Sequence, residues 1–333
     1  MENKLTMQII GGSKIDENFK FEKDSIFEAA GAAASICYDD NANNSLSKFL
    51  NETKERKIKR GKSMANVGHG SPIEHTSVSL LFHNISKIQT MILNNQRVYS
   101  LTERSFRYSK PEHQPKLYIE WLDRLTRAGM KEKRAKEIAR YMISVFERNS
   151  TAYYTMNIRQ INVLLRMFEE FVAQNSNSKN DFLKEVCKHI SNLYIVLKPF
   201  DIYLEKNKYQ KLKLFENEVP EEFVKSGLYL LSSKVSPVAF GQLQRHRSLT
   251  YKIVFNETDE YYIPPVIERL NLKLQWIEDA KTVNFPNCKL LTIYEYGEVA
   301  DFMMKYDIRK GPEVQEETRD NVLKTKEKLD KLI

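Results

Sequence analysis

Residues 75–111, HTSVSLLFHNISKIQTMILNNQRVYSLTERSFRYSKP, contain the signals for one structural unit. The opening HTSVSLLFHN alternates and is rich in β-formers, which predicts a strand. Ser86 then begins a segment with apolar residues at helical spacing, and its hydroxyl suits a helix N-cap. Polar ERSFRY, residues 103–108, follows the helix. The predicted order is therefore strand, helix and polar segment.

The second half of the chain repeats this order. SGLYLLSSKV at 226–235 predicts a strand, SPVAFGQLQRHRSLTY at 236–251 predicts a helix, and FNETDEYYIPP at 255–265 is polar, aromatic and ended by prolines. Laid in register, Gln96-Arg97 corresponds to His246-Arg247. We infer a degenerate internal duplication, with residues 1–210 as the first copy and residues 211–333 as a truncated second copy.

The remaining segments predict a mixture of helices and strands. MQIIGG at 7–12 is strand-like, whereas 24–40 and 46–66 show helical spacing. Residues 111–205 carry apolar residues three and four apart almost throughout, which predicts a layer of helices. The fold class that we expect is therefore α+β.

Composition limits the possible classes of protein. The chain has 333 residues, 41% of them apolar, and a formal net charge of +8. No apolar run approaches the roughly 18 residues of a membrane span, so we expect a cytoplasmic protein. Cys37, Cys187 and Cys288 are odd in number and widely spaced, which predicts neither disulfides nor structural zinc. The positive charge favours anionic partners, without indicating nucleic acid specifically.

The densest cationic cluster is QLQRHRSLT, residues 242–250. On a helix, Gln242, Arg245 and His246 would share one face because they lie three and four residues apart. Guanidinium groups so close repel one another unless an anion neutralises them, and Arg forks suit phosphates or electron-rich carbonyl groups. The cluster predicts an anion site, and the alternative is a pair of surface arginines beside a histidine.

Two other segments carry groups of chemical interest. GHGSPIEH, residues 68–75, places His69, Ser71, Glu74 and His75 together, but the spacing does not match H-E-x-x-H and a third metal ligand is not evident. We therefore predict a capped turn that leads into a strand, without a metal. In ERSFRY, an extended chain would place Glu103, Ser105 and Arg107 on one side, as a phosphate site or a cross-strand ion pair.

Together these motifs resemble those of the flavin-dependent thymidylate synthases. That family carries H-x-S/T-P-x-E-H, then R-H-R-x-x-S-x-N-E-x-S-x-R-Y, and later N-x-R and L-R-x-x-x-x-A-Q-x-E-I-R on helices. The first half matches at His69, Ser71, Pro72, Glu74, His75, Arg97, Ser100, Glu103, Ser105, Arg107, Tyr108, Arg140, Asn157 and Arg159. It departs from the pattern where Asn95 and Gln96 replace Arg and His, and where Phe168 replaces the later Arg.

The second half resembles the complementary part of the pattern. It matches at Gln242, Arg245, His246, Arg247, Thr250, Arg309, Gln315, Glu317 and Arg319. Asp259-Glu-Tyr-Tyr262 replaces Ser-x-Arg-Tyr, no N-x-R is visible, and Gly311-Pro312 interrupts the final helix. Each half therefore keeps residues that the other has lost.

The resemblance implies an antiparallel-rich sheet packed against a helical layer. Family members are homotetramers whose active sites lie between subunits. A fused pair would replace two subunits, so a homodimer of this chain would imitate the tetramer.

The resemblance also implies a reaction: C5 methylation of dUMP to dTMP with FAD, NADPH and methylenetetrahydrofolate. Arg309 would be the catalytic residue, because a fixed cation against the uracil ring stabilises its anionic form. The residues expected to hold the nucleotide are Gln242, Arg245, Glu103, Ser105, Arg107, Arg140 and Arg309. Those expected to hold the flavin are Ser71, Glu74, Arg245, His246, Arg247, Asn157 and Arg159.

Two alternatives stay open at this point. Because neither half carries a complete signature, the chain could be a degenerate pseudoenzyme that binds a nucleotide or serves as a scaffold. The same cofactors could also support hydroxymethylation of a pyrimidine nucleotide, or a reaction on UMP in place of dUMP, because substrate choice depends on a few contacts near the 2′ position.

Overall fold

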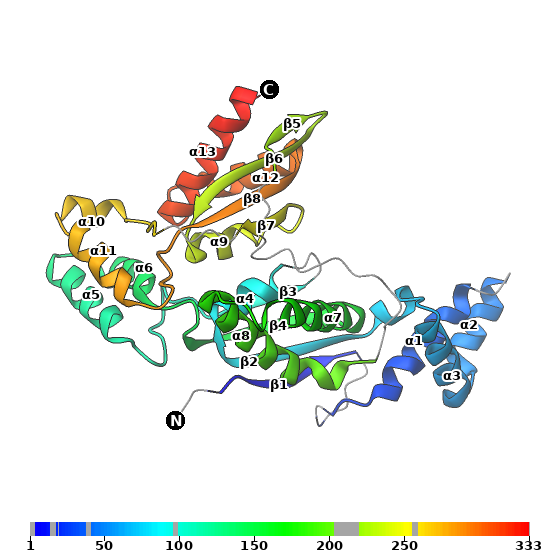
Figure 1. The fold of residues 1–333 in the computed structure, drawn as a ribbon. Coiled ribbons are helices and arrows are strands. Elements are labelled where there is room, and N and C mark those ends of the chain that lie inside the picture. Colours follow the sequence, from blue (N-terminus) through cyan, green and yellow to red (C-terminus); the bar gives the residue numbers. More distant parts are fainter. Residues whose placement is uncertain are drawn as a thin grey trace. The chain divides into compact units, whose positions relative to one another are not determined.

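The computed structural model describes residues 4–13, 18, 20–37, 41–95, 99–202, 220–254 and 259–332 (Figure 1). The chain packs as two compact units. The first contains residues 1–85, 98–103 and 151–212, and the second contains residues 86–97, 104–150 and 213–333. Two segments of the first half thus pack with the second half. The predicted copy boundary at residue 210 lies outside the described residues and stays a prediction.

A four-stranded sheet organises the first unit. Its strands β1 (Thr6–Gly12), β2 (Ser77–Ser86), β3 (Ser100–Glu103) and β4 (Arg148–Asn157) stand in the order β1-β2-β4-β3. β1 pairs with β2 and β3 with β4, both antiparallel. On β2, Val78, Leu80 and Phe82 are fully buried, and this period of two places them on one face of the sheet. That face carries the core of the first unit.

Helices α1 (Lys23–Cys37), α2 (Ala42–Asn51) and α3 (Lys54–Asn66) follow β1. Gly31 on α1 and Gly61 on α3 allow a close crossing, since a Cβ on either would overlap a backbone carbonyl of the other helix. The prediction of one helix over 46–66 is wrong. The chain breaks at Glu52, and the Thr53 hydroxyl caps α3 by accepting a hydrogen bond from the Arg56 N–H at 3.5 Å.

Two further helices, α7 (Ile158–Asn175) and α8 (Asp181–Leu197), follow β4 and pack against each other. The short turn η3 (Lys198–Phe200) comes next. The buried Asn162 side chain ties α7 to this turn. Its Nδ2 donates to the Phe200 carbonyl at 3.0 Å and its Oδ1 accepts from the Ile202 N–H at 2.9 Å. A buried amide with both ends satisfied fixes how the chain leaves α8.

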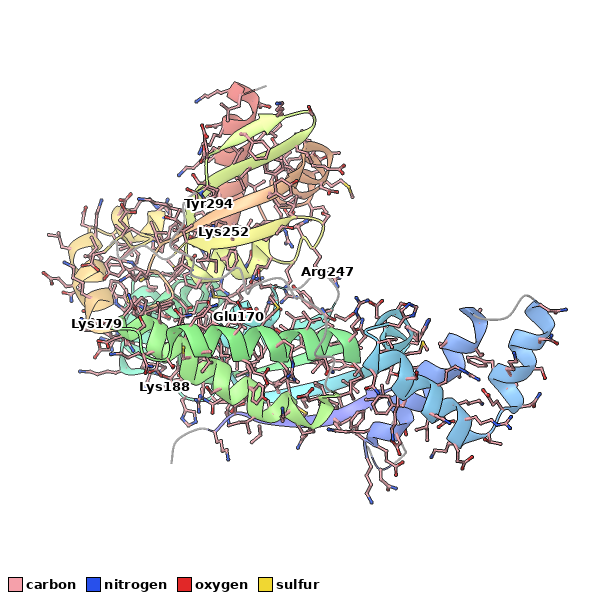
Figure 2. The ribbon with its side chains drawn as sticks, turned by 45° about the vertical axis from the view of Figure 1, so that its right-hand side comes forward. Glu170, Lys179, Lys188, Arg247, Lys252 and Tyr294 are labelled. Atoms are coloured by element: carbon pink, nitrogen blue, oxygen red, sulfur yellow. The ribbon has the colours of Figure 1, made fainter. Side chains whose placement is uncertain are left out.

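A second four-stranded sheet organises the second unit. Its strands β5 (Phe223–Lys225), β6 (Leu228–Val235), β7 (Thr250–Val254) and β8 (Leu291–Glu298) stand in the order β5-β6-β8-β7, with antiparallel neighbours. In chain order this is first, second, fourth, third, the same order as in the first sheet. Figure 2 labels Lys252 and Tyr294, which pair across β7 and β8.

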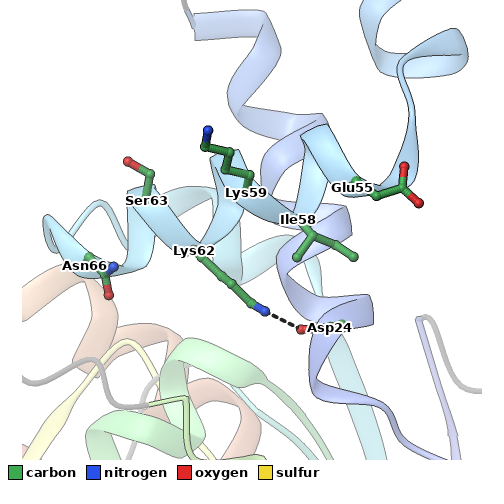
Figure 3. Close-up of a pocket in the computed structure, with 7 residues that line it drawn as sticks. All are labelled: Asp24, Glu55, Ile58, Lys59, Lys62, Ser63 and Asn66. Atoms are coloured by element: carbon green, nitrogen blue, oxygen red, sulfur yellow. Dashed lines mark ion pairs between the residues drawn. The ribbon is translucent and has the colours of Figure 1, made fainter.

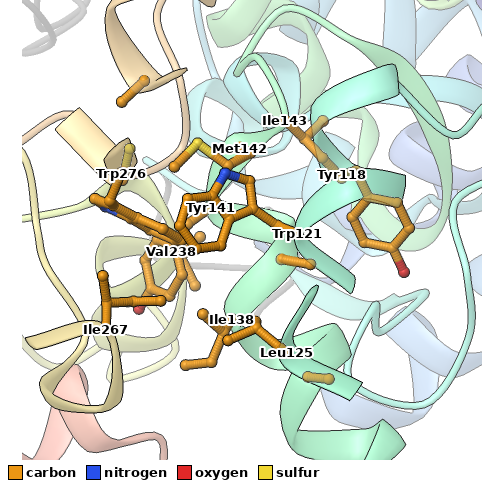
Figure 4. Packing of buried hydrophobic residues seen from close by; sticks show 14 residues of the cluster. Tyr118, Trp121, Leu125, Ile138, Tyr141, Met142, Ile143, Val238, Ile267 and Trp276 are labelled. Carbon is orange, nitrogen blue, oxygen red and sulfur yellow. The ribbon is translucent and has the colours of Figure 1, made fainter. Parts of the chain in front are cut away.

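The helices of the second unit come from both halves of the chain. The helical elements are α4 (Lys87–Leu93), α5 (Lys116–Arg127), α6 (Glu132–Ala139), η2 (Arg140–Met142), α9 (Pro237–Leu243), α10 (Pro265–Arg269), α11 (Lys273–Thr282), α12 (Val299–Arg309) and α13 (Glu316–Leu332). Buried residues of α5, α6, η2, α9, α10 and α11 form one core, shown in Figure 4. The rings of Trp121 and Trp276 meet edge to face at 4.8 Å between centroids.

The α+β fold class is confirmed by these two antiparallel sheets and their helices. The helical prediction for 111–205 is wrong at β4, whose RNSTAYYTMN is rich in β-formers and alternates in burial. The prediction of a helix over 236–251 is wrong beyond Leu243, because the chain turns there and continues as β7.

None of the helices in the described ranges is both long and apolar enough to cross a membrane.

Candidate functional site

The first unit brings four of the expected flavin-binding residues together. Ser71 and Glu74 lie on the turn η1 (Ser71–His75), and Asn157 and Arg159 lie at the start of α7. The Ile158 N–H donates to the Thr76 carbonyl at 2.9 Å, which holds α7 beside the end of this turn. Residues more than 80 positions apart thus form one cluster.

Glu74 and Arg159 form an ion pair, in which the Arg159 Nη1 donates to the Glu74 carboxylate. Asn157 caps α7, because its Oδ1 accepts from the Gln160 N–H at 2.8 Å. The Arg159 guanidinium lies against Gly70, where a Cβ would come within 2.6 Å of Nε. Only glycine leaves that space, so the guanidinium is seated in a backbone cradle and remains partly exposed.

The cationic segment in the second unit begins at the end of α9. Gln242 lies in the last turn of this helix, but Arg245 and His246 follow it in tight turns. The prediction that these three residues share a helical face is therefore wrong. Arg245 and Arg247 are exposed, and Figure 2 shows Arg247 in the loop beyond the helix. Helix formation stops here, and an exposed loop presents the cations.

His246 and Arg309 meet across this loop. The Arg309 Nε donates to the His246 Nε2 at 3.0 Å, so the imidazole accepts through its unprotonated nitrogen. Burial, Arg309 and Lys305 lower the pKa of His246 to about 4. Burial and the neighbouring Arg245 also lower the pKa of Arg309. The histidine is therefore neutral at pH 7 and orients a cationic guanidinium.

A buried ion pair lies one helical turn before Arg309. Lys305 on α12 is fully buried and donates to Glu295 on β8, and the Tyr229 hydroxyl donates to the same carboxylate at 2.5 Å. Lys305 and Arg309 are four residues apart and so share one helix face. The sequence analysis missed this group. Its only sequence signal was Glu295, which stands between two tyrosines in β8.

Glu317 is the centre of a second buried network. Its carboxylate accepts from the Ser236 N–H at 2.7 Å, from the Ser236 hydroxyl at 2.6 Å and from the Tyr141 hydroxyl at 2.6 Å. Burial raises the pKa of Glu317 in spite of these bonds. The Thr318 hydroxyl donates to the Gln242 Oε1 at 3.0 Å, which connects the end of α9 to α13, the helix that carries Glu317.

Arg140 lies beside this network. Its Nε donates to the Glu137 carbonyl at 3.2 Å, and its buried Nη2 has no hydrogen-bond partner among the described residues. Burial, opposed by Tyr141 and Glu137, lowers the pKa of Arg140. Tyr141 was missed by the sequence analysis, because a single tyrosine in a helical pattern carries no signal of its own.

Ser105 and Arg107 belong to the second unit, where Arg107 lies close to Arg140, whereas Glu103 ends β3 in the first unit. The prediction that all three lie on one side of an extended chain is wrong. The chain leaves β3 and turns, with the Tyr108 N–H donating to the Ser105 carbonyl at 3.0 Å. The Arg107 Nε lies 3.4 Å from the Glu137 Oε1, which keeps the guanidinium near Arg140.

The expected residues thus form two groups. Ser71, Glu74, Glu103, Asn157 and Arg159 belong to the first unit. The others belong to the second unit: Ser105, Arg107, Arg140, Gln242, Arg245, His246, Arg247 and Arg309. Gln96 and Arg97, the first-half counterparts of His246 and Arg247, lie outside the described residues.

A shallow hollow on α1 and α3 was not predicted. Lys59, Lys62 and Ser63 line it together with Asp24, and the Lys62 Nζ lies 2.8 Å from the Asp24 Oδ1 (Figure 3). In the described ranges, no group of three or more His, Cys, Asp or Glu side chains could hold a metal ion. Cys187 and Cys288 are free and buried.

Part of the chain is similar to a known family of proteins. The family model for thymidylate synthase complementing protein matches residues 23–177. A flavin-dependent thymidylate synthase from Clostridium tetani (strain Massachusetts / E88) is 28% identical over 207 residues, which make up 50% of this chain and 80% of that protein.

Two solved structures are similar at low TM-scores. The UMP/dUMP methylase PolB from Streptomyces cacaoi, bound with 5-Br dUMP, has a TM-score of 0.39 and 16% identity, over 59% of this chain and 91% of that chain. ThyX from Helicobacter pylori, complexed with FAD and dUMP, has a TM-score of 0.38 and 17% identity, over 61% of this chain and 99% of that chain. The family model and the clostridial relative thus show that residues 23–177 are similar to the flavin-dependent thymidylate synthases.

Proposed function

We propose that the chain catalyses reductive C5 methylation of dUMP to dTMP, with methylenetetrahydrofolate as carbon donor and NADPH and FAD as cofactors. The observation that carries the proposal is the bond between Arg309 and His246. Both residues lie outside the segment matched by the family model, yet they come from two separate motifs of the family. Their meeting supports a working site in the second half.

Arg309 acts on the pyrimidine ring. Its guanidinium keeps its charge on burial, so it stabilises the ring in its anionic form and raises electron density at C5. The neutral His246 accepts one guanidinium N–H and leaves the other donors for the ring carbonyl groups. A protonated histidine would repel the guanidinium and lose this bond.

The nucleotide phosphate is held by cations and hydrogen-bond donors near Arg140. The Nη2 of Arg140, which has no partner among the described residues, and the guanidinium of Arg107 supply positive charge. The Ser105 hydroxyl supplies a further hydrogen-bond donor. Gln242, fixed by Thr318, and Arg245 extend this surface toward Arg309. Glu103 stays assigned to the nucleotide by resemblance.

The residues in the first unit fit an anionic dinucleotide cofactor. The cradled, partly exposed Arg159 and the exposed Ser71 offer a charge and a hydroxyl, as a pyrophosphate requires. Glu74 keeps Arg159 in place, and Asn157 fixes the start of α7. In the second unit, Arg245, His246 and Arg247 stay assigned to the flavin by resemblance. FAD, when bound and reduced, supplies the hydride.

The first test is the Arg309→Ala variant with Lys310→Ala as its matched control. Lys310 is the next residue and pairs only with Asp307 among the described residues, at 2.6 Å. We expect Arg309→Ala to lower dTMP formation by about 100-fold or more while FAD absorbance is retained, because an electrostatic group of the site is removed. Full activity of Arg309→Ala, or an equal loss in Lys310→Ala, would rule out the assignment.

Nucleotide binding without catalysis is the second candidate. It is favoured by the replacement of the signature Arg-His by Asn95-Gln96 in the first half. A protein of this kind would bind dUMP and show no flavin absorbance after incubation with FAD.

Mass analysis of the product would separate methylation from hydroxymethylation and dUMP from UMP as substrate.

A further inference from the structure

Corresponding segments of the two halves meet within the second unit. Helix α4 follows the second strand of its sheet, as α9 does in the other sheet, and these two helices pack together. The Gln244 Nε2 donates to the Met91 carbonyl at 3.1 Å, and Gly241 leaves room for the Lys87 side chain. In each half, a pair of helices lies between the third and fourth strands: α5 and α6 in the first half, and α10 and α11 in the second. These two pairs also meet, since Trp121 of α5 touches Trp276 of α11.

The segments that lead into β4 and β8 pair antiparallel to each other. Ser144 and Pro286 form the bridge. On either side of it, the Val145 N–H donates to the Phe285 carbonyl at 2.9 Å and the Asn287 N–H donates to the Ile143 carbonyl at 2.8 Å. Antiparallel contact between equivalent segments is what a local two-fold axis produces, as at an isologous dimer interface.

We propose that the chain is a covalent pseudo-dimer that carries one anionic-nucleotide site, at Arg140 and α13, in place of the two that a symmetric dimer would have. The inference rests on the proposed function for the identity of the nucleotide. Arg140 and Tyr141 come from the first copy, and Ser236 and Glu317 from the second. The site is therefore assembled across the two copies.

The reciprocal site has lost its residues. Where the second copy has Glu317, the first has Ser176, and where the second has Arg309, the first has Phe168. Asn95 stands in the place of Arg245. The ring-facing cation, the buried carboxylate and one guanidinium are absent from these positions together, so selection has kept one site of the pair.

The counterpart of Arg140 in the second copy is also a cation, Lys281. Lys281 precedes Glu298 by the same number of residues as Arg140 precedes Asn157. Glu298 and Asn157 are the N-cap residues of α12 and α7. Lys281 is exposed on α11, whereas Arg140 has a solvent-inaccessible Nη2. Lys281→Ala is therefore the matched control for Arg140→Ala, because each removes one cation from corresponding positions.

The test counts bound ligand on the full chain after loading with FAD, by equilibrium dialysis at saturation. The probes are dUMP and, separately, inorganic phosphate. We expect one dUMP per chain, with affinity reduced about 10- to 100-fold in Arg140→Ala and unchanged in Lys281→Ala. Arg140→Lys, which keeps the charge, guards against misfolding, and tryptophan fluorescence checks the fold of each variant.

Two dUMP molecules per chain would overturn the inference, and so would one dUMP that Lys281→Ala removes and Arg140→Ala does not. Failure of both probes to bind would overturn it as well. A chain that ignores dUMP but binds one phosphate in an Arg140-dependent manner would keep the single site while refuting the proposed substrate. Flavin absorbance reports on the proposed function independently of these counts.

Discussion

Two helices that occupy corresponding places in the two halves begin in different ways. Ser86 caps α4 with a reciprocal pair, because the Ser86 hydroxyl accepts from the Gln89 N–H and the Ser86 N–H donates to the Gln89 side chain at 3.0 Å. Ser236 caps α9 through the Ala239 N–H at 3.2 Å, but its own N–H donates to Glu317, 81 residues further along the chain. The N–H of the capping serine thus finds its acceptor within the same turn in one half, and on the distant helix α13 in the other.

The difference between the two caps lies in whether the acceptor of the serine N–H is local or tertiary. The pair of Ser86 and Gln89 is a capping box, which satisfies two donors within one turn. In the second half a charged acceptor from α13 takes the same role and gains a third donor, the Tyr141 hydroxyl. Hydrogen bonds to charged groups are stronger than neutral ones, so the second cap contributes more to stability.

The largest effect is expected from Glu317→Ala. Removing the carboxylate leaves the Ser236 N–H and the Tyr141 hydroxyl buried without an acceptor, and we expect a loss of about 3 kcal/mol or more in the free energy of unfolding. The measurement is urea unfolding followed by tryptophan fluorescence, because Trp121 and Trp276, the two tryptophans of the chain, both lie in the core of the second unit.

The control for this variant is Gln89→Ala, which removes the local acceptor at the other cap. Its expected loss is about 1 kcal/mol. Equal losses in Glu317→Ala and Gln89→Ala would contradict the distinction between the tertiary and the local cap.

A smaller contrast is expected between Ser236→Ala and Ser86→Ala. The Ser236 hydroxyl caps α9 and also donates to Glu317, whereas the Ser86 hydroxyl bonds within its own turn. We expect losses of about 2 kcal/mol and about 1 kcal/mol, by the same fluorescence-detected unfolding. A larger loss in Ser86→Ala would show that the tertiary network adds nothing to the cap.

The last contrast concerns pH and another pair of counterparts, His246 and Gln96. Because the pKa of His246 is lowered to about 4 in the folded chain, the unfolded chain binds the proton first as pH falls. The contribution of His246 to stability is thus complete above its ordinary pKa of about 6.5 and is lost between about 6.5 and 4. His246→Gln, which copies the first half, should flatten this part of the profile, measured by urea unfolding at pH 7, 5.5 and 4.5.

The candidate residues could be named from the sequence because the motifs specify residue types at fixed spacing, and their roles stay predictions. Ser71, Glu74, Asn157 and Arg159 lie together in the structure, since both of their segments are short and adjoin one strand each. The prediction that Gln242, Arg245 and His246 share a helical face was wrong, because the helical spacing in the sequence continues past the point where the backbone turns. The strand β4 was missed for a similar reason, since its alternation was hidden between two long helical segments.

From the sequence we could read the order of most elements, the resemblance to a family and the residue types that carry charge, because these depend on local propensity and on motifs. Packing alone revealed that α4, α5 and α6, which come from the first half of the chain, belong to the same compact unit as the second sheet. Packing also assembled Arg140, Tyr141, Ser236 and Glu317 into one buried network. Such pairings depend on which apolar faces meet and which buried donors find acceptors, and neither is encoded in spacing along the chain.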